Sequence, residues 1–261
     1  MPTRIALVGD IHGNVAALDA ALAEIDAAGA DWLAITGDLV LNGPRPAESI
    51  ARVRELEAGG AVVVQGNTDV AVADFDYGAA FPWMEDVPDT HRAAAEWAQE
   101  QLSDDDLEWL RRLPWERRIT LDTESDESDE SDESDTTMVL ICHGSPGSQT
   151  QGLTTDLDPG ETLRLLARTD ARVVGCGHTH VAEVREVGRK LIVNPGSCGY
   201  AFDGDPNAAW ALLTIDDDGE PSAELHRAAY DATSVANELS ERGLAGDVYR
   251  AATVRRGVLV R

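Results

Sequence analysis

The stretch Gly9-Asp10-Ile11-His12-Gly13-Asn14 directly follows the β-rich run Arg4–Val8. It therefore places an aspartate and a histidine, both potential metal ligands, at the end of an expected strand, and strand ends are where open α/β sheets bind ligands. Later parts of the chain repeat this arrangement. The further polar segments are Gly37-Asp38 after Trp32–Thr36, Gly66-Asn67 after Ala61–Gln65, His143-Gly144 after Met138–Cys142, and Gly177-His178-Thr179-His180 after Arg172–Gly175.

Together these segments offer the ligands for a site with two divalent cations. Such a site needs oxygen and imidazole ligands, a carboxylate that can bridge, and open positions for water and substrate. Taken singly, each segment could be an ordinary turn, because Gly-Asp and Gly-Asn are common turn dipeptides. Four of the six histidines lie in these segments, and this joint occurrence indicates a two-metal hydrolase. The candidate ligands are Asp10, His12, Asp38, Asn67, His143, His178 and His180.

The same segments resemble the calcineurin-like metallophosphoesterase family, whose pattern runs Asp-x-His, Gly-Asp-x-x-Asp, Gly-Asn-His-Asp/Glu, His and Gly-His-x-His. The match spans residues 8–199. The segments most similar to the branch related to diadenosine tetraphosphatases and small phosphodiesterases are Gly9–Asn14, Gly37–Val40 followed by Gly43-Pro44, and Asn194–Ser197.

The resemblance implies a dinuclear mechanism, in which a hydroxide bridging two divalent cations attacks phosphorus in line. Mn²⁺ is the first choice of metal, with Ni²⁺, Zn²⁺, Fe²⁺ and Mg²⁺ as alternatives. The implied catalytic residues are Asp38, Asn67 and His143. The implied ligands are Asp10, His12 and His180 for one metal and Asn67, His143 and His178 for the other, with Asp38 as the bridge.

Two departures from the family pattern bear on the substrate. Thr68 stands where the family often has the histidine that protonates the leaving group. Leu41 and Asn42 replace the aspartate that would orient that histidine and the phosphate-binding arginine of the protein phosphatases. A lost general acid typically costs ~10²–10⁴ in rate when the leaving oxygen needs a proton. The departures argue against a serine/threonine protein phosphatase and favour small phosphodiesters or pyrophosphate-like substrates.

The periodicity predicts an α/β fold in a single domain spanning residues 1–261, namely a four-layer α/β/β/α sandwich of two mixed β-sheets flanked by helices. A Rossmann-type fold is the alternative, but no Gly-x-Gly-x-x-Gly follows the first strand. Ser103 is expected to cap a helix. The expected helices are Asn14–Ala28, Pro46–Ala58, Thr90–Leu102, Asp104–Leu113 and Pro159–Arg168. The further expected strands are Arg117–Leu121, Ala182–Val187, Lys190–Asn194, Ala209–Ile215 and Ser222–Ala228.

The segment Glu124–Asp135 consists of repeated Glu-Ser-Asp units. Such a run cannot bury apolar surface, so a disordered, solvated acidic loop is expected at about residues 122–136. The formal net charge of the chain is −27, and Lys190 is its only lysine. This balance is similar to that of proteins from salt-loving organisms, with a generally acidic mesophile protein as the alternative.

The charge also restricts the expected partners. Duplex DNA or an anionic membrane would be repelled, so a small phosphoester substrate is expected, without bulk nucleic acid or a membrane. The oligomeric state stays open, a homodimer included. The three cysteines have no paired spacing, and there is neither a leader nor an apolar run near 18 residues, so a cytoplasmic location is expected.

Several residues outside the motifs have two interpretations. Arg45 could reach a substrate phosphate or be a surface arginine that caps a helix. The basic stretch Arg250–Arg261 could close over the active site or pair with acidic surface. His91 is expected to be structural or exposed. Helix packing is expected, with a substrate-stacking face as the alternative, for Trp83, Trp97, Trp109 and Trp115.

The sequence thus predicts a metal-dependent phosphoesterase that hydrolyses a small phosphodiester or nucleotide-type phosphate ester. One alternative is a non-catalytic interaction scaffold of the same fold, as the metallophosphoesterase-like subunit of the retromer coat is thought to be. The other, less favoured, is a protein Ser/Thr phosphatase. All seven candidate ligand positions carry chemically competent side chains, which favours the enzyme.

Overall fold

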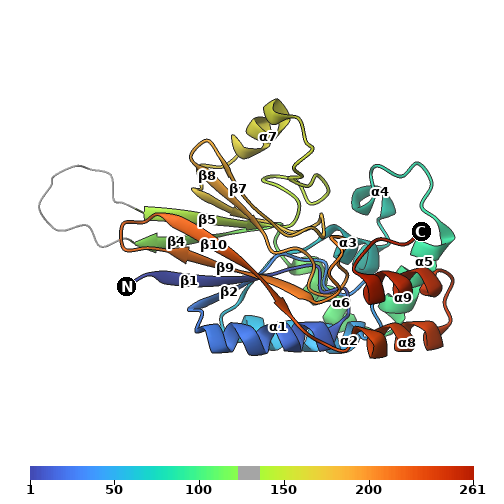
Figure 1. Cartoon of the computed structure of the whole chain (residues 1–261). Coiled ribbons are helices and arrows are strands. Elements are labelled where there is room, and N and C mark those ends of the chain that lie inside the picture. Colours follow the sequence, from blue (N-terminus) through green and yellow to red (C-terminus); the bar gives the residue numbers. More distant parts are fainter. Residues whose placement is uncertain (123–135) are drawn as a thin grey trace, which may run out of the picture.

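The computed structural model describes residues 1–122 and 136–261, so the acidic loop predicted at about 122–136 lies outside the described residues except at its ends. Among the described residues the strands form two mixed sheets (Figure 1). The first sheet has the order β10 (Pro221–Ala228), β9 (Ala208–Ile215), β1 (Thr3–Val8), β2 (Trp32–Ile35), β3 (Val62–Val63). The second has the order β4 (Glu116–Asp122), β5 (Thr136–Cys142), β6 (Val173–Gly175), β8 (Lys190–Asn194), β7 (Glu183–Val187).

The two sheets pack face to face because their strands alternate apolar side chains between two cores. Ile5 and Leu7 of β1 lie in a core shared with Val139 and Ile141 of β5 in the second sheet. Ala6 and Val8 point the other way, into a core formed with the helices. The predicted four-layer α/β/β/α sandwich is confirmed, and the Rossmann-type alternative is excluded because the strands lie in two sheets.

Helices cover the outer faces of both sheets (Figure 1). The expected helices are confirmed, with ends that shift by one or two residues. Asn14 caps the first of them by accepting a hydrogen bond from the Ala17 N–H, and Ser103 caps another as predicted. These helices are α1 (Val15–Ala28), α2 (Pro46–Ala58), α5 (Asp89–Glu100), α6 (Asp104–Arg112) and α7 (Pro159–Leu166).

In the part of the chain that the structure describes, four further helices, which the sequence patterns did not predict, gather near one end of the molecule. They are α3 (Asn67–Asp74), α4 (Tyr77–Ala80), α8 (Ala232–Arg242) and α9 (Asp247–Arg256). The last two pack together around the buried side chain of Tyr200. Figure 1 places α4, α5, α8 and α9 at the end of the molecule toward which β1 runs.

The parallel strands of both sheets end on this same side. In the first sheet β1, β2 and β3 run parallel, and in the second β5, β6 and β8 do. Loops that leave the carboxyl ends of neighbouring parallel strands meet at one edge, which is where ligands bind in such sheets.

None of the helices in the described residues is long and apolar enough to cross a membrane.

Candidate metal centre

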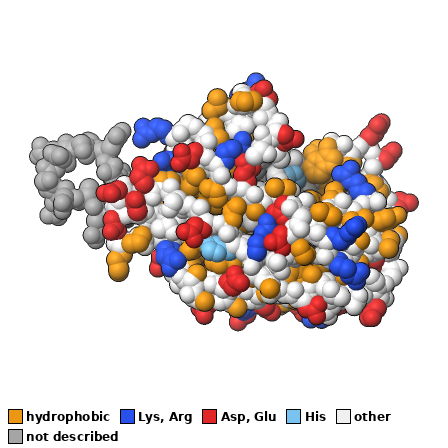
Figure 2. Space-filling view, in the orientation of Figure 1, with side chains coloured by type: hydrophobic (Ala, Val, Ile, Leu, Met, Phe, Trp, Pro, Cys, Tyr) orange, Lys and Arg blue, Asp and Glu red, His pale blue; other side chains and the backbone are white. Residues whose placement is uncertain are grey.

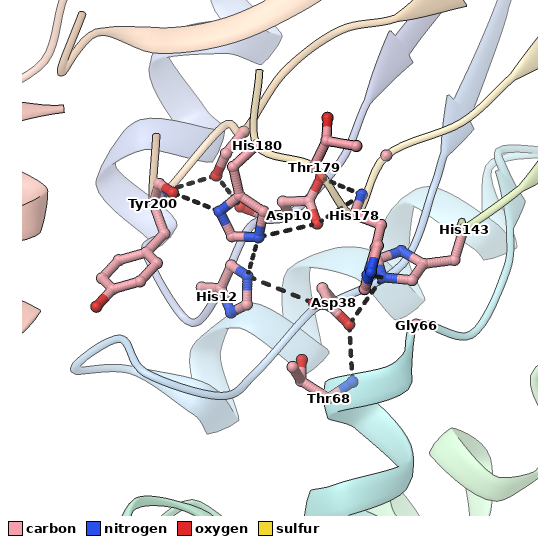
Figure 3. A network of polar contacts seen from close by, with 12 residues as sticks. Asp10, His12, Asp38, Gly66, Thr68, His143, His178, Thr179, His180 and Tyr200 are labelled. Carbon is pink, nitrogen blue, oxygen red and sulfur yellow. Dashed lines mark hydrogen bonds and ion pairs between the residues drawn. The ribbon is translucent and has the colours of Figure 1, made fainter. Parts of the chain in front are cut away.

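The fold brings all seven predicted ligand side chains together. Figure 3 shows six of them, namely Asp10, His12, Asp38, His143, His178 and His180. Asp10 and His12 follow β1, Asp38 follows β2, and Asn67 begins α3 directly after β3. His143 follows β5, and both remaining histidines follow β6. Six of the seven side chains are buried, and His178 is half-buried.

The side chains form two groups that share one carboxylate. In the first group, Asp10, His12, Asp38 and His180 offer ligand atoms that all lie within 4.8 Å of one another. In the second, Asn67 Oδ1 lies 2.9 Å from His143 Nε2 and 2.9 Å from His178 Nδ1. The two oxygens of Asp38 face different groups, since Oδ2 is 3.6 Å from His12 Nε2 and Oδ1 is 3.4 Å from His143 Nε2. This is the geometry of a carboxylate that can bridge two cations.

Backbone carbonyls fix the orientation of the ligand side chains. The Nδ1 atom of His12 donates to the Leu41 carbonyl at 2.8 Å, and that of His143 donates to the Thr36 carbonyl at 2.7 Å. His180 Nδ1 likewise contacts the Tyr200 carbonyl. A neutral imidazole that donates through Nδ1 keeps a lone pair on Nε2, and here each Nε2 points into the cluster. These carbonyl contacts, which side-chain motifs cannot reveal, orient the three rings.

Because of this orientation, hydrogen-bond acceptors face one another. His12 Nε2 and His180 Nε2 are 3.2 Å apart, although each ring uses its other nitrogen for a carbonyl. Asn67 donates through Nδ2 to the Ala80 carbonyl at 2.9 Å, so its Oδ1 is the atom that faces His143 Nε2. Two lone pairs at such distances repel unless a cation lies between them. The donor set, imidazole nitrogens with carboxylate and amide oxygens, is one that divalent transition metals accept.

Burial keeps three of the imidazole rings in the neutral form that binds metal. Burial lowers the pKa of His12 and of His180, and it brings the pKa of His178 down to about 4, so these rings stay neutral near pH 7. Burial and the neighbouring Asp38 carboxylate raise the pKa of Asp10 well above its usual value. An added cation would reverse that last shift, because a positive charge favours the ionised carboxylate.

The backbone around the cluster adopts conformations that cost energy. Asp10, His12, Asp38, His178 and His180 all have positive φ, between 52° and 69°. A left-handed conformation costs a non-glycine residue ~1–2 kcal/mol, so such clustering points to a functional requirement. Two glycines make room for the carboxylates, because a Cβ would lie 2.1 Å from Asp38 Oδ1 at position 66 and 2.7 Å from Asp10 Oδ2 at position 177.

Asp69 holds two of the ligand loops together. Its buried carboxylate accepts hydrogen bonds from the backbone N–H groups of Asp38, Leu39 and Gly66, at 2.8–3.0 Å. The first two N–H groups belong to the loop after β2 and the third to the loop after β3. Asp69 therefore acts on the cluster through the position of Asp38.

The Asn194–Ser197 segment does the same for the loops after β1 and β6. Asn194 Nδ2 donates to the Gly177 carbonyl at 2.9 Å, and Ser197 Oγ donates to the Asp10 carbonyl at 2.7 Å. The segment thus supports ligand loops from both sheets, and none of its side chains enters the cluster of seven.

The structure also shows what surrounds the positions that depart from the family pattern. Thr68 donates its backbone N–H to Asp38 Oδ1 at 2.9 Å, while its buried Oγ1 has no hydrogen-bond partner among the described residues. Leu41 is buried and Asn42 Oδ1 accepts from Arg250 Nε at 3.2 Å. Position 68 therefore offers no imidazole in place of the histidine that the family often has there.

A cavity of about 750 Å³ opens over the cluster. His12, Asp38, Asn67 and both histidines of the loop after β6 line its floor. His91, which was expected to be structural or exposed, lines its walls. Arg250, from the basic stretch with two interpretations, also lines them and pairs with Asp247 at 3.0 Å. Arg45 does not take part, because it forms an exposed ion pair with Glu238 at 2.8 Å.

Residues 3–218 match the family model described as the calcineurin-like phosphoesterase superfamily domain. The chain belongs to this superfamily. The expected family is thereby confirmed, and with it a phosphoesterase-type hydrolase fold whose buried cluster could hold divalent metal.

Individual proteins are similar to this chain over most of its length. An uncharacterized protein of Methanocaldococcus jannaschii, MJ0912, is 24% identical over 243 residues, which cover 87% of this chain and 88% of that protein. The crystal structure of a metallophosphoesterase from Sphaerobacter thermophilus has a TM-score of 0.72 at 26% identity, covering 99% of this chain and 100% of the other. That of protein PH1004 from Pyrococcus horikoshii has a TM-score of 0.78 at 19% identity, with 98% of both chains covered.

Proposed function

We propose that this protein is a metal-dependent phosphoesterase that hydrolyses a small phosphodiester or a nucleotide-type phosphate ester at a dinuclear centre. The opposed acceptor atoms carry the proposal, above all His12 Nε2 and His180 Nε2 at 3.2 Å and Asn67 Oδ1 and His143 Nε2 at 2.9 Å. Membership in the superfamily supports the same reaction class. Mn²⁺ is the metal proposed first.

Each side chain has a proposed task. His180, His12 and Asp10 would hold one cation, and Asn67, His143 and His178 would hold the second, with Asp38 positioned to serve both. When bound there, divalent cations lower the pKa of coordinated water and neutralise charge on the phosphoryl oxygens. The protein orients these ligands through the Leu41, Thr36 and Tyr200 carbonyls, so little reorganisation is needed during the reaction.

The surroundings of the cluster support small esters over phosphoproteins. Asn42 stands where the protein phosphatases have an arginine, and its side-chain oxygen is already engaged by Arg250. Thr68 offers no ionisable group for protonating a leaving group. Aryl esters and nucleotide phosphates, whose leaving groups depart with less assistance, fit such a site better than alkyl phosphomonoesters.

The proposal is tested with metal-loaded and chelated protein against bis(p-nitrophenyl) phosphate, p-nitrophenyl phosphate, dinucleoside polyphosphates and a phosphoserine peptide. We expect hydrolysis of the diesters or polyphosphates with Mn²⁺, and little with the peptide. His143→Ala should abolish the activity, whereas His226→Ala, in β10 and outside the cavity lining, should retain it.

Two outcomes would contradict the enzyme. Hydrolysis that survives both chelation and His143→Ala does not depend on the cluster, which contradicts the proposed metal centre. Stoichiometric metal binding without hydrolysis of any substrate would favour the interaction scaffold instead.

A further inference from the structure

The cavity over the metal cluster has walls from three segments that are far apart in the sequence. Residues 81–91 form one wall, Tyr200 and Phe202 another, and residues 246–261 a third. Most of the wall side chains are apolar or aromatic, in contrast to the polar floor. This division lets one part of a ligand contact the cluster while another part contacts apolar surface.

Packing within the protein accounts for some of these aromatic side chains. Phe202 stacks on the ring of His180, with centroids 4.1 Å apart and planes at 12°, and so supports a candidate ligand. Phe81 is only 4% exposed, belongs to the helical core and meets His91 edge-on at 5.8 Å. Neither side chain is free to cover a ligand over much of its surface.

Trp83 differs from them because 54% of the residue's surface is exposed. Its ring meets the His178 ring edge-on, with centroids 5.8 Å apart, so it lies directly beside the cluster. Tyr249 and Leu259, in another wall, are 48% and 42% exposed. Figure 2 shows hydrophobic side chains beside a hollow in which a histidine is visible, over the region where Figure 1 places the segment from α4 to α5.

The other tryptophans in the middle of the chain behave differently. Trp97 and Trp109 pack against the helical core, as expected for helix packing. Trp115 is 60% exposed but lies outside the cavity lining. Only Trp83, among these four side chains, combines exposure with a place beside the candidate ligands.

We propose that Trp83 is a specificity-determining residue, which stacks on a planar aromatic group, a nucleobase or an aryl ring, joined to a phosphate that binds at the cluster. The proposal rests on the proposed function for the phosphate position. A flat ring gains most from an exposed indole, because it covers the apolar face and interacts with its π-system. Because Trp83 lies close to His178, an aromatic group stacked on the indole would be only a few bonds away from a phosphate bound at the cluster.

The test compares two phosphomonoesters that differ only by a base, adenosine 5′-monophosphate and ribose 5-phosphate, as ligands of the Mn²⁺-loaded protein. Dissociation constants are measured by calorimetry, which requires no turnover. We expect the nucleotide to bind about 5- to 150-fold more tightly, the range measured when base–aromatic stacking is removed. Trp83→Ala should bring this ratio close to one, while Trp83→Phe should keep most of it.

Trp115→Ala is the matched control, because it removes an equally exposed tryptophan outside the cavity and should leave the ratio unchanged. A ratio near one in the unmodified protein, or a ratio that survives Trp83→Ala, overturns the stacking role. If the unmodified protein still hydrolyses bis(p-nitrophenyl) phosphate in that case, only the stacking role is overturned and the proposed function is retained. Failure of both ligands to bind overturns the stacking role together with phosphate binding at the cluster.

Discussion

The floor and the walls of the cavity are built in different ways. On the floor, side chains such as His12 and His180 are buried and held by backbone carbonyls at 2.5–2.8 Å. On the walls, Trp83 and Tyr249 leave about half of their surface exposed, at 54% and 48%. A rigid polar floor suits chemistry that is the same for every substrate. An apolar, accessible wall suits the selection of one substrate group.

The largest effect is expected from a change in the floor. Asp38→Asn keeps the shape of the residue that faces both groups of ligands but removes its charge and makes one of its oxygens a nitrogen. We expect kcat to fall by about 10³-fold or more, since charge stabilisation at the reacting centre is lost, and the metal content to fall below two per chain. Steady-state kinetics and elemental analysis measure the two results.

Asp86→Asn provides the comparison in the wall, because Asp86 is exposed and lines the cavity without belonging to either ligand group. It removes the same charge from a residue of the same type. Equal losses of kcat in both variants would show that floor and walls do not divide their tasks as proposed here.

The next effect concerns the leaving group. Because Thr68 and Leu41 cannot supply or orient a proton donor, kcat should fall steeply as the pKa of the leaving group rises. We expect alkyl esters to react ~10²–10⁴-fold more slowly than p-nitrophenyl esters, the range that general-acid catalysis typically contributes. A series of substituted phenyl and alkyl diesters at saturating metal measures this slope.

The double substitution Leu41→Asp with Thr68→His restores the family dyad and should flatten the slope. Both positions line the cavity, so the new side chains can face a substrate. A flat slope in the unmodified protein, with the chemical step shown to be rate-limiting, would mean that another group in the cavity donates the proton.

The difference between floor and walls also explains how far the sequence could be interpreted. The residues of the floor could be picked out from the sequence, because each candidate ligand lies within a few residues of a β-rich run. The signal in the sequence is therefore local. The arrangement of the parallel strands in two packed sheets follows from the alternation of apolar side chains. In β1, Ile5 and Leu7 face one core, and Ala6 and Val8 face the other. A pattern of this kind needs no knowledge of distant contacts.

The walls carry no such signal. His91, Tyr200 and Arg250 come together only after α8 and α9 have packed against the rest of the chain. The periodicity of α9 is hard to recognise, since its buried positions include Asp247 and Arg250. Their pairing at 3.0 Å allows both charges to be buried, and a sequence read for apolar stripes therefore passes over this helix.

Metal removal should lower thermal stability, and this effect should be smaller than the changes in kcat described above. A cation that binds only the folded state stabilises it by ~2.7 kcal/mol at a hundred times its dissociation constant, which corresponds to about 5–10 °C in Tm for a chain of this size. We expect that difference between Mn²⁺-loaded and chelated protein in calorimetric scans. Trp83→Ala, a wall variant, should show the same rise, and Asp38→Asn a smaller one. An unchanged Tm on chelation would contradict a metal site on the floor.

The smallest effect is expected from salt, and it should act on the outer surface while sparing the floor. The chain carries a formal charge of −27, so exposed like charges repel one another in dilute buffer. Raising KCl from ~0.1 M to ~1 M shortens the Debye length from ~10 Å to ~3 Å and screens that repulsion. Tm should therefore rise by several degrees, while buried contacts such as that between Asp10 and His180 change little.

Sucrose serves as the control for this last prediction, because it strengthens apolar burial without screening charge. A deletion of Glu124–Asp135 sharpens it further. Asp122 and Thr136 are paired in register, so Thr123 and one added glycine can join β4 to β5 as a two-residue turn. The shortened protein carries fewer acids and should depend less on KCl, with kcat unchanged. If KCl and sucrose raise Tm equally, or if Tm stays flat in KCl, the acidic surface is not an adaptation to salt and the proposed screening of its charges is wrong.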